Sequence, residues 1–143
     1  MNNTKGIILA GGMATRLFPI TKTITKQLLP IYDKPMIYYP LTLLMLAKIR
    51  DIAIIVSPGQ KKNFYSVLKD GSQWGIKLTY LLQNKPDGIG QAYIIAEKFL
   101  NNNNSLMILG DNLFYGNKIQ LILKNILEKK IPSIFGYKVS DPE

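Results

Sequence analysis

The chain has 143 residues, 47% of them hydrophobic, which is enough for one domain with its own core. Neither cysteine nor histidine occurs, and this excludes disulfides, thiolate nucleophiles, histidine general bases and nearly all zinc sites. The formal net charge is +9, yet the lysines are scattered and the arginines are only Arg16 and Arg50, whereas nucleic-acid binders cluster basic residues. We therefore expect no nucleic-acid partner, and chemistry based on carboxylates, cations, backbone amides and oxygen-ligated metals.

Short apolar runs alternate with amphipathic segments, the pattern of a mostly parallel sheet with helices on its faces. In chain order, the sequence predicts a strand at 6–10, a helix at 36–47, a strand at 52–56, a helix at 60–68, a strand at 77–82, a helix at 89–100, a strand at 105–109, a helix at 118–130 and a strand at 133–139. The 77–82 strand is less apolar than the others, so we expect it nearer a sheet edge.

The first and third helices carry further expectations. Pro35 stands near the first turn of the 36–47 helix, where its missing N–H is not needed. Pro40 either kinks that helix or marks its true start. In the 89–100 helix, apolar residues recur at helical spacing, and we expect them to face inward: Tyr93, Ile94, Ala96 and Phe99.

The two ends of the chain differ in what they predict. The first five residues are polar and no long apolar stretch follows them, so we expect neither a signal peptide nor a membrane span, and a cytoplasmic protein. The last four residues are turn-like and add no closing element. We therefore expect the chain to stop before its fold is complete.

A glycine-rich loop, residues 11–17, follows the first predicted strand directly. Glycines let the backbone approach a ligand and present N–H groups to anionic oxygens. The loop matches neither G-x-G-x-x-G nor the P-loop pattern G-x-x-x-x-G-K-[ST]. Taken alone, it is either a phosphate-binding loop or a simple tight turn between strand and helix.

Three stretches taken together resemble the signature of the sugar nucleotidyltransferases. They are residues 5–12, then Thr15-Arg16-Leu17, then Lys26-Gln27-Leu28-Leu29-Pro30. The family pattern is G-G-x-G-T-R-L followed by K-x-x-x-P. Residues 31–40 resemble the thymidylyltransferase branch in particular, and the resemblance covers essentially the whole chain.

The resemblance implies an α/β fold, a three-layer α/β/α Rossmann-like nucleotidyltransferase domain with a mostly parallel sheet. Residues 1–143 would form its N-terminal nucleotide-binding part, truncated before the sugar-binding half. Full-length relatives are usually tetramers, so a homo-oligomer is implied.

The implied reaction transfers a thymidylyl group from dTTP to glucose 1-phosphate, giving dTDP-glucose and pyrophosphate, with Mg²⁺ as cofactor. Its product would serve nucleotide-sugar biosynthesis of the dTDP-rhamnose type for cell-surface polysaccharide such as lipopolysaccharide. Such a transfer needs alignment of two anions more than acid–base chemistry, so the absence of histidine is no obstacle. The alternative is a catalytically incompetent nucleotide-binding module or remnant.

The resemblance also implies roles for residues around the loop. Arg16 would grip the β and γ phosphates as a guanidinium fork, rather than form a surface ion pair. Lys26 would lie between the phosphates of the two substrates, rather than being merely solvated. The remaining expected phosphate contacts come from Gly11, Gly12, Thr15 and, more peripherally, Gln27.

The later part of the chain supplies the expected base and metal contacts. Gln83 would pair with the pyrimidine edge, and Gly88 would let the base lie close to the backbone, although Pro-Asp-Gly also makes a plain turn. Asp111, after a buried strand, is the metal candidate, or else a helix cap or turn aspartate. Asn112 would touch the sugar or orient Asp111.

One departure from the family pattern lies inside the loop. Met13-Ala14 stands where the family usually has a small residue followed by glycine. Alanine disfavours a positive φ angle, and methionine removes a hydroxyl donor that is often present there. We expect weaker triphosphate binding, which the double change Met13→Ser with Ala14→Gly would reverse.

Overall fold

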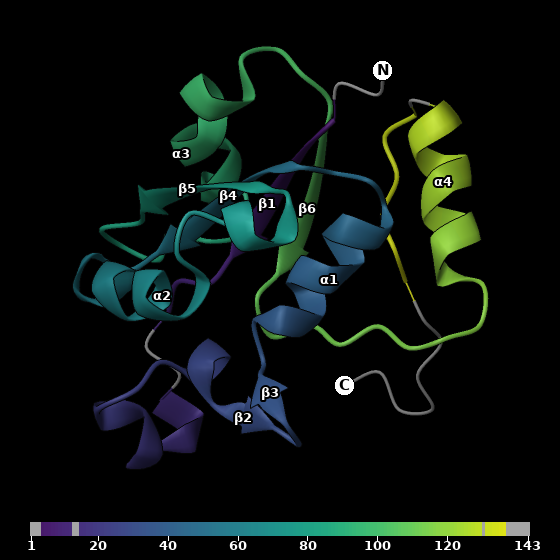
Figure 1. Cartoon of the computed structure of the whole chain (residues 1–143). Coiled ribbons are helices and arrows are strands. Elements are labelled where there is room, and N and C mark those ends of the chain that lie inside the picture. The colour runs from purple at the N-terminus through teal and green to yellow at the C-terminus, as the bar shows by residue number, and fades with distance from the viewer. Residues whose placement is uncertain (1–3, 13–14, 130, 137–143) are drawn as a thin grey trace.

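The computed structural model describes residues 4–12, 15–129 and 131–136 of the chain. Four strands form a central parallel sheet in the order β5-β4-β1-β6: β1 (Lys5–Leu9), β4 (Asp51–Val56), β5 (Lys77–Leu82) and β6 (Ser105–Leu109). In β1, Ile7 pairs with Ala53 on one side and with Met107 on the other (Figure 1). The strand at 77–82 lies at the sheet edge, as expected.

Helices cover both faces of this sheet. They are α1 (Tyr38–Leu46), α2 (Lys61–Leu68), α3 (Gln91–Leu100) and α4 (Ile119–Lys129). The larger core joins Ile8 and Ile54 to apolar side chains of α1, α2 and α4. On the opposite face, Ile7 and Ile55 pack against α3. The three-layer α/β/α architecture is therefore confirmed.

The strands of the sheet are apolar because both faces are covered. In β4, every residue from Ile52 to Val56 is fully buried. Parallel strands covered on both faces become continuous apolar runs rather than alternating ones. This property made the strands predictable without any knowledge of their order.

The prediction for Pro35 is wrong. Pro35 belongs to β3 (Lys34–Pro35), which pairs antiparallel with β2 (Pro30–Ile31) in a short separate ribbon. Helix α1 begins only at Tyr38, so Pro40 lies in its first turn, where N–H groups have no partner inside the helix. Of the two alternatives, Pro40 marks the start of the helix.

The prediction for the buried face of α3 is half wrong. Ala92 and Ala96 are fully buried, but Tyr93 is 41% and Ile94 is 74% exposed. Phe99 packs at the edge of the buried cluster, as expected. The side of α3 that faces the sheet is formed by small residues, because alanine lets the helix lie close to the sheet. The apolar pattern of the sequence did not show which apolar residues would be buried.

The strand predicted at 133–139 does not form in its described part. Residues 133–136 pair with no strand, and residues 137–139 lie outside the described residues. Here Ser133 Oγ donates to Ile131 O at 3.0 Å, a local bond. The Phe135 ring packs edge-on against Phe114, with ring centroids 6.2 Å apart. Local and aromatic contacts therefore replace a strand ladder over these residues.

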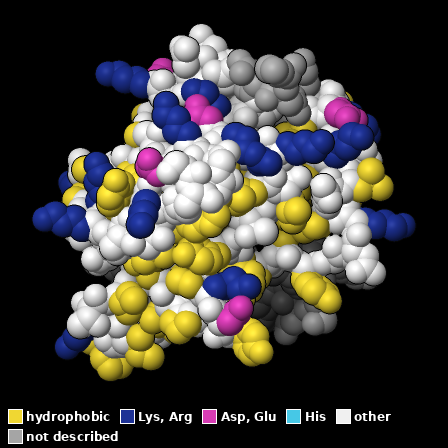
Figure 2. Space-filling model, in the orientation of Figure 1, with side chains coloured by type: hydrophobic (Ala, Val, Ile, Leu, Met, Phe, Trp, Pro, Cys, Tyr) yellow, Lys and Arg dark blue, Asp and Glu magenta, His cyan; other side chains and the backbone are white. Residues whose placement is uncertain are grey.

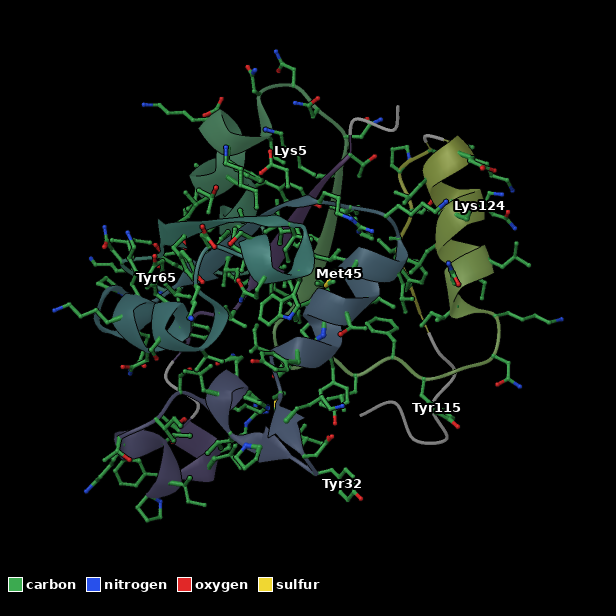
Figure 3. The ribbon with its side chains drawn as sticks, viewed as in Figure 1. Lys5, Tyr32, Met45, Tyr65, Tyr115 and Lys124 are labelled. Carbon is green, nitrogen blue, oxygen red and sulfur yellow. The ribbon has the colours of Figure 1, made fainter. Side chains whose placement is uncertain are left out.

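Basic side chains are dispersed over the molecular surface, which also exposes many large hydrophobic side chains, among them Phe18, Ile20 and Ile134. Figure 2 shows lysine and arginine spread across the visible face, with acidic side chains among them. Tyr32 and Tyr115 project away from the fold (Figure 3) and are almost completely exposed. In the described part of the chain, no helix combines the length and apolarity that crossing a bilayer requires.

Candidate functional site

The strand order places a ligand site between β1 and β6. The chain runs from β1 outward to β4 and β5, then crosses to the other side of β1 to form β6. Open α/β sheets bind ligands outside the carboxyl ends of their strands, where the order reverses in this way. The glycine loop follows β1 and Asp111 follows β6. The Gly110 N–H donates to Leu9 O at 2.8 Å and holds the two strand ends together.

A pocket of about 330 Å³ opens at this reversal point, a size within the range of about 300–1,000 Å³ typical of small-ligand sites. Three segments distant in sequence line it: Gly11, Gly12, Thr15, Arg16, Leu17, Lys26, Gln27 and Asp111. The fold thus brings together every residue expected to contact phosphate, with the expected metal ligand. Leu17 joins them without having been predicted.

Arg16 enters the pocket from a short 3-10 helix, Thr15–Leu17. Among the described residues, no carboxylate forms an ion pair with it. The alternative role in a surface ion pair therefore finds no partner there. An exposed guanidinium beside backbone glycines is instead suited to bind an anionic ligand by paired, charge-assisted hydrogen bonds.

Gly12 shows why glycine is needed in the loop. Its φ angle is +116°, a conformation that residues with a Cβ atom rarely adopt. The Gly12 N–H points at Ser57 Oγ, 3.4 Å away, just beyond the end of β4. Sequence reasoning did not select Ser57, although its position directly after a strand was a signal for it. Met13 and Ala14, the departure from the family pattern, lie outside the described residues.

Lys26 and Asp111 form an ion pair across the pocket. Lys26 Nζ lies 2.9 Å from Asp111 Oδ2, and each side chain is about one-third exposed. Lys26 begins the short 3-10 helix Lys26–Leu28, and Asp111 follows β6. The structure therefore joins two residues predicted independently and separated by 85 positions. The pocket thus contains an ammonium group and a carboxylate in contact with each other.

Gln27 lies in the wall of the pocket, deeper than the peripheral place expected. It is 6% exposed, and Thr25 Oγ1 donates to Gln27 Oε1 at 2.7 Å. Its aliphatic part packs so closely on Gly110 that a Cβ atom there would lie 3.0 Å from Gln27 Cγ. Gln27 therefore connects the lysine segment to the ends of β1 and β6.

The residues expected to bind the base and sugar surround this pocket without lining it. Gln83 is 5% exposed and lies directly behind Gly11. Gly88 is exposed in the loop between β5 and α3, with φ of +92°. Asn112 lies in a neighbouring hollow of about 590 Å³ that shares Asp111 with the first pocket. Gln91, which sequence reasoning missed, accepts a hydrogen bond from Gln83 and opens α3, which two residues separate from the Pro-Asp-Gly turn.

A parallel α/β sheet with a cationic, glycine-lined pocket at its reversal point is the arrangement in which open α/β folds commonly bind anionic ligands such as nucleotides. The comparison with protein families agrees. Residues 5–143 match the family model described as nucleotidyl transferase. The chain belongs to the nucleotidyl transferase family.

Curated relatives are similar across nearly the whole chain. A glucose-1-phosphate thymidylyltransferase of Neisseria gonorrhoeae is 56% identical over 140 residues, which is 97% of this chain and 49% of the relative. The enzyme of the same name from Mycobacterium tuberculosis is 48% identical over 96% of this chain and 48% of its own length. The chain thus spans about half the length of these relatives.

Solved structures share the fold. A Bacillus anthracis protein described as a glucose-1-phosphate thymidylyltransferase, crystallised with sucrose, superposes with a TM-score of 0.82 at 40% identity, over 89% of this chain and 51% of that one. A UDP-glucose pyrophosphorylase in complex with UDP-glucose has a TM-score of 0.72 at 29% identity, over 88% of this chain and 52% of that one.

Proposed function

We propose that this chain provides the nucleotide-binding part of an enzyme that transfers a thymidylyl group from dTTP to glucose 1-phosphate and releases pyrophosphate. The observation that carries the proposal is the grouping of Arg16, Lys26 and Asp111 around one pocket beside the glycine loop. The names of the relatives support the choice of nucleotide and sugar.

In this proposal the loop and Arg16 bind the triphosphate. The N–H groups of Gly11 and Gly12 and the hydroxyl of Thr15 offer hydrogen bonds, and the guanidinium neutralises the β and γ phosphates. Because pyrophosphate is the leaving group, charge develops on exactly those phosphates during transfer. Donors that are already in place stabilise this charge without reorganisation.

Lys26 would reduce the repulsion between the two anionic substrates. The attacking sugar phosphate and the α-phosphate must come into line, and a compact ammonium between them lowers the electrostatic cost. The ion pair with Asp111 keeps Lys26 in the pocket before substrates bind. Binding of a triphosphate would then draw Lys26 away from Asp111 and free the carboxylate.

A Mg²⁺ ion fits this site only as one shared with the nucleotide. The described residues contain no group of three or more side chains of the types His, Cys, Asp and Glu that could hold a metal. Mg²⁺ commonly takes one or two carboxylates and completes its shell with phosphate oxygens and water, so Asp111 alone is a sufficient protein ligand. When bound, the ion would supply charge neutralisation at the phosphates.

The base and sugar contacts complete the proposal. Gln83 would offer both a donor and an acceptor to a pyrimidine edge, Gly88 would leave the backbone accessible, and Asn112 would contact the sugar beside Asp111. Use of the product in a dTDP-rhamnose pathway remains a prediction from sequence. A nucleotide-binding module without turnover, the alternative expected from the sequence, is the second candidate.

The two arginines of the chain allow a matched test. Arg16→Gln removes the cation from the pocket, and we expect dTTP affinity measured by calorimetry with Mg²⁺ to fall roughly 10- to 100-fold, because a charge-assisted bond to phosphate is lost. Arg50→Gln is the control, since the Arg50 side chain donates, within the described residues, to the carbonyl oxygens of Met45 and Ile49 and lies outside the pocket.

Pyrophosphate release from dTTP and glucose 1-phosphate then separates the two candidates. Turnover supports the enzyme, and dTTP binding without turnover supports the module. If the wild type fails to bind dTTP, or if both arginine variants bind it equally well, the pocket does not hold the triphosphate.

A further inference from the structure

Behind the glycine loop, three polar side chains form a continuous hydrogen-bonded series. Gln83 Nε2 donates to Gln91 Oε1 at 2.7 Å, and Gln91 Nε2 donates to Asp87 Oδ2 at 3.1 Å. The backbone N–H of Asp87 also points at Gln91 Oε1, at 3.3 Å. The series links the end of β5 to the first residue of α3 across the 84–90 loop.

The chemistry of Asp87 determines which way both amides turn. An ionised carboxylate only accepts hydrogen bonds, so Gln91 must direct its NH₂ group at Asp87. The oxygen of Gln91 then faces the Asp87 N–H and Gln83. Because that oxygen only accepts, Gln83 must direct its own NH₂ group at Gln91. The orientation of Gln83 therefore follows from a carboxylate two hydrogen bonds away.

This orientation leaves the oxygen of Gln83 directed toward the pocket loop. A Cβ atom built on Gly11 would collide with Gln83 Oε1, so the amide oxygen lies directly against Gly11. None of the described residues donates a hydrogen bond to this oxygen. Within the described residues, neither the second N–H of Nε2 nor the Oε1 acceptor has a hydrogen-bond partner, so both would meet a ligand in one fixed arrangement.

Building on the proposed function, we propose that Gln91 and Asp87 are positioning residues that set the base preference by holding the Gln83 amide in one orientation. Thymine and uracil present the N3–H donor beside a carbonyl acceptor, whereas cytosine presents the N3 acceptor beside an amino donor. A fixed amide meets only one of these two patterns at a given place, but a freely turning amide meets both. The fixed series therefore selects the imide bases.

The test compares dissociation constants for dTTP and dCTP by calorimetry in the presence of Mg²⁺. The wild-type chain is expected to bind dTTP more tightly. Asp87→Asn replaces the carboxylate by an amide that can turn either way, so only the longer bond from the backbone N–H of position 87, at 3.3 Å, still favours the original orientation of Gln91. We expect the preference for dTTP over dCTP to shrink about threefold to tenfold, the value of one hydrogen bond.

A double variant provides the rescue. Asp87→Asn combined with Gln91→Glu exchanges the carboxylate and the amide within the series. The new carboxylate at position 91 accepts from Gln83, from the backbone N–H and from the new amide at position 87, so the orientation of Gln83 is restored. We expect the dTTP preference to return to the wild-type value, which a general loosening of the loop would not produce.

Gln91→Met removes the acceptor while keeping the length of the side chain, and it should lower the preference at least as much as Asp87→Asn. Gln120→Met, at an exposed position of α4, is the matched control and should change nothing. If Gln91→Met unfolds, the exposed loop variant Asp87→Asn and its rescue still decide the question.

Three results would overturn the positioning role. They are equal affinity of the wild type for dTTP and dCTP, an unchanged preference in folded Asp87→Asn, and a double variant that fails to regain the preference. Absence of any dTTP binding to the wild type would instead refute the proposed function itself, and the positioning role with it.

Discussion

At the scale of single residues, free space distinguishes glycines that look alike in the sequence. Gly11 lies in the loop after β1, and Gly59 lies in the short 3-10 helix Pro58–Gln60 after β4. A Cβ atom on Gly11 would collide with Gln83 Oε1, whereas one on Gly59 would meet nothing within 4 Å. Gly11 therefore packs the glycine loop directly against Gln83, and Gly59 has no such contact.

Gly11→Ala is expected to displace Gln83 and to harm both stability and binding. Overpacking of this kind costs about 1–3 kcal/mol of unfolding free energy, and we expect dTTP affinity to fall about tenfold because the displaced amide no longer meets the base. Urea unfolding and calorimetry measure the two effects.

Gly59→Ala is the matched control and should stay within about 0.5 kcal/mol of the wild type. Equal changes in stability and dTTP affinity for the two alanine substitutions would show that Gly11 and Gln83 are not in close contact.

At the scale of elements, α3 is distinguished by the small residues through which it packs. Ala92 and Ala96 are fully buried against the sheet face formed by Ile7 and Ile55, while Ile94 is 74% exposed. The helix thus turns its small side chains inward and a large apolar one outward. A short distance between helix and sheet requires this arrangement, because protein interiors are closely packed.

Ala96→Leu should destabilise the protein by about 1–3 kcal/mol, since the buried side leaves no room for the added methylene groups. Ile94→Ala, a comparable change in volume on the exposed side of the same helix, should alter stability by no more than about 0.5 kcal/mol. Thermal and urea unfolding would check both variants. The reverse ranking would mean that the helix is rotated relative to the sheet.

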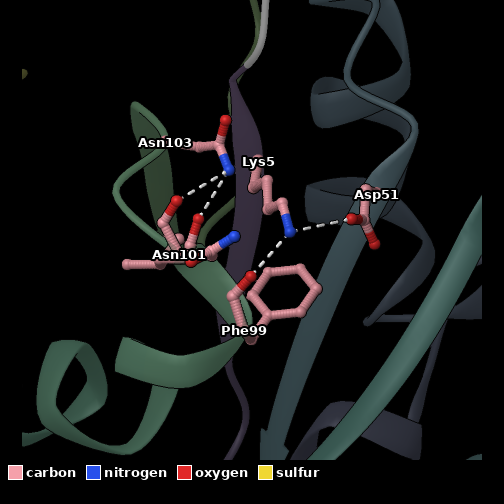
Figure 4. Close-up of polar contacts among 6 residues, drawn as sticks. Lys5, Asp51, Phe99, Asn101 and Asn103 are labelled. Atoms are coloured by element: carbon pink, nitrogen blue, oxygen red, sulfur yellow. Dashed lines mark hydrogen bonds and ion pairs between the residues drawn. The ribbon is translucent and has the colours of Figure 1, made fainter.

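At the scale of the whole molecule, the two ends of the sheet have separate tasks. The carboxyl ends of β1 and β6 carry the pocket. At the amino ends, Lys5 Nζ donates to Phe99 O at 2.6 Å and pairs with Asp51 Oδ2 at 3.2 Å, which ties β1, β4 and α3 together (Figure 4). Lys5 belongs to the motif that carries the family resemblance, yet its contacts are structural.

Tyr80 makes the stability of the whole fold depend on pH. Its hydroxyl, on the edge strand β5, donates to Lys69 O at 2.6 Å. Burial, followed by the nearby Tyr65 and Asp70, raises the pKa of Tyr80 above its ordinary value of 10.0. The folded state therefore holds this proton more tightly than the unfolded state does. The contribution of Tyr80 to the free energy of unfolding is complete below pH 10. It is lost as the pH rises through the higher pKa that Tyr80 has in the folded protein.

Tyr80→Phe should lower the unfolding free energy at pH 8 by about 1 kcal/mol, because one hydrogen bond is lost. The difference in unfolding free energy between this variant and the wild type should narrow above about pH 10, because only the wild type has a Tyr80 hydroxyl that can ionise. Urea unfolding at a series of pH values measures the gap. Tyr115→Phe, at a fully exposed side chain, is the control, and a gap for Tyr80→Phe that is constant with pH would contradict the assignment.

The sequence alone was sufficient to predict most helices and strands and most of the residues that line the pocket. Strands buried on both faces are apolar throughout, and helices show their own period, so each can be read locally. The glycine loop and Asp111 follow strands, where open α/β sheets bind ligands, and short motifs that resemble those of the family marked Arg16 and Lys26. For these reasons Arg16, Lys26 and Asp111 were predicted before their common pocket was known.

Only the tertiary structure decided the features that depend on contacts between distant segments. Pro35 joined a ribbon instead of a helix, Ile94 turned outward, and Lys26 met Asp111 across 85 positions. The series from Asp87 through Gln91 to Gln83 was likewise absent from any local pattern. Packing distance and hydrogen-bond direction determine these features, and both arise only when the chain has folded.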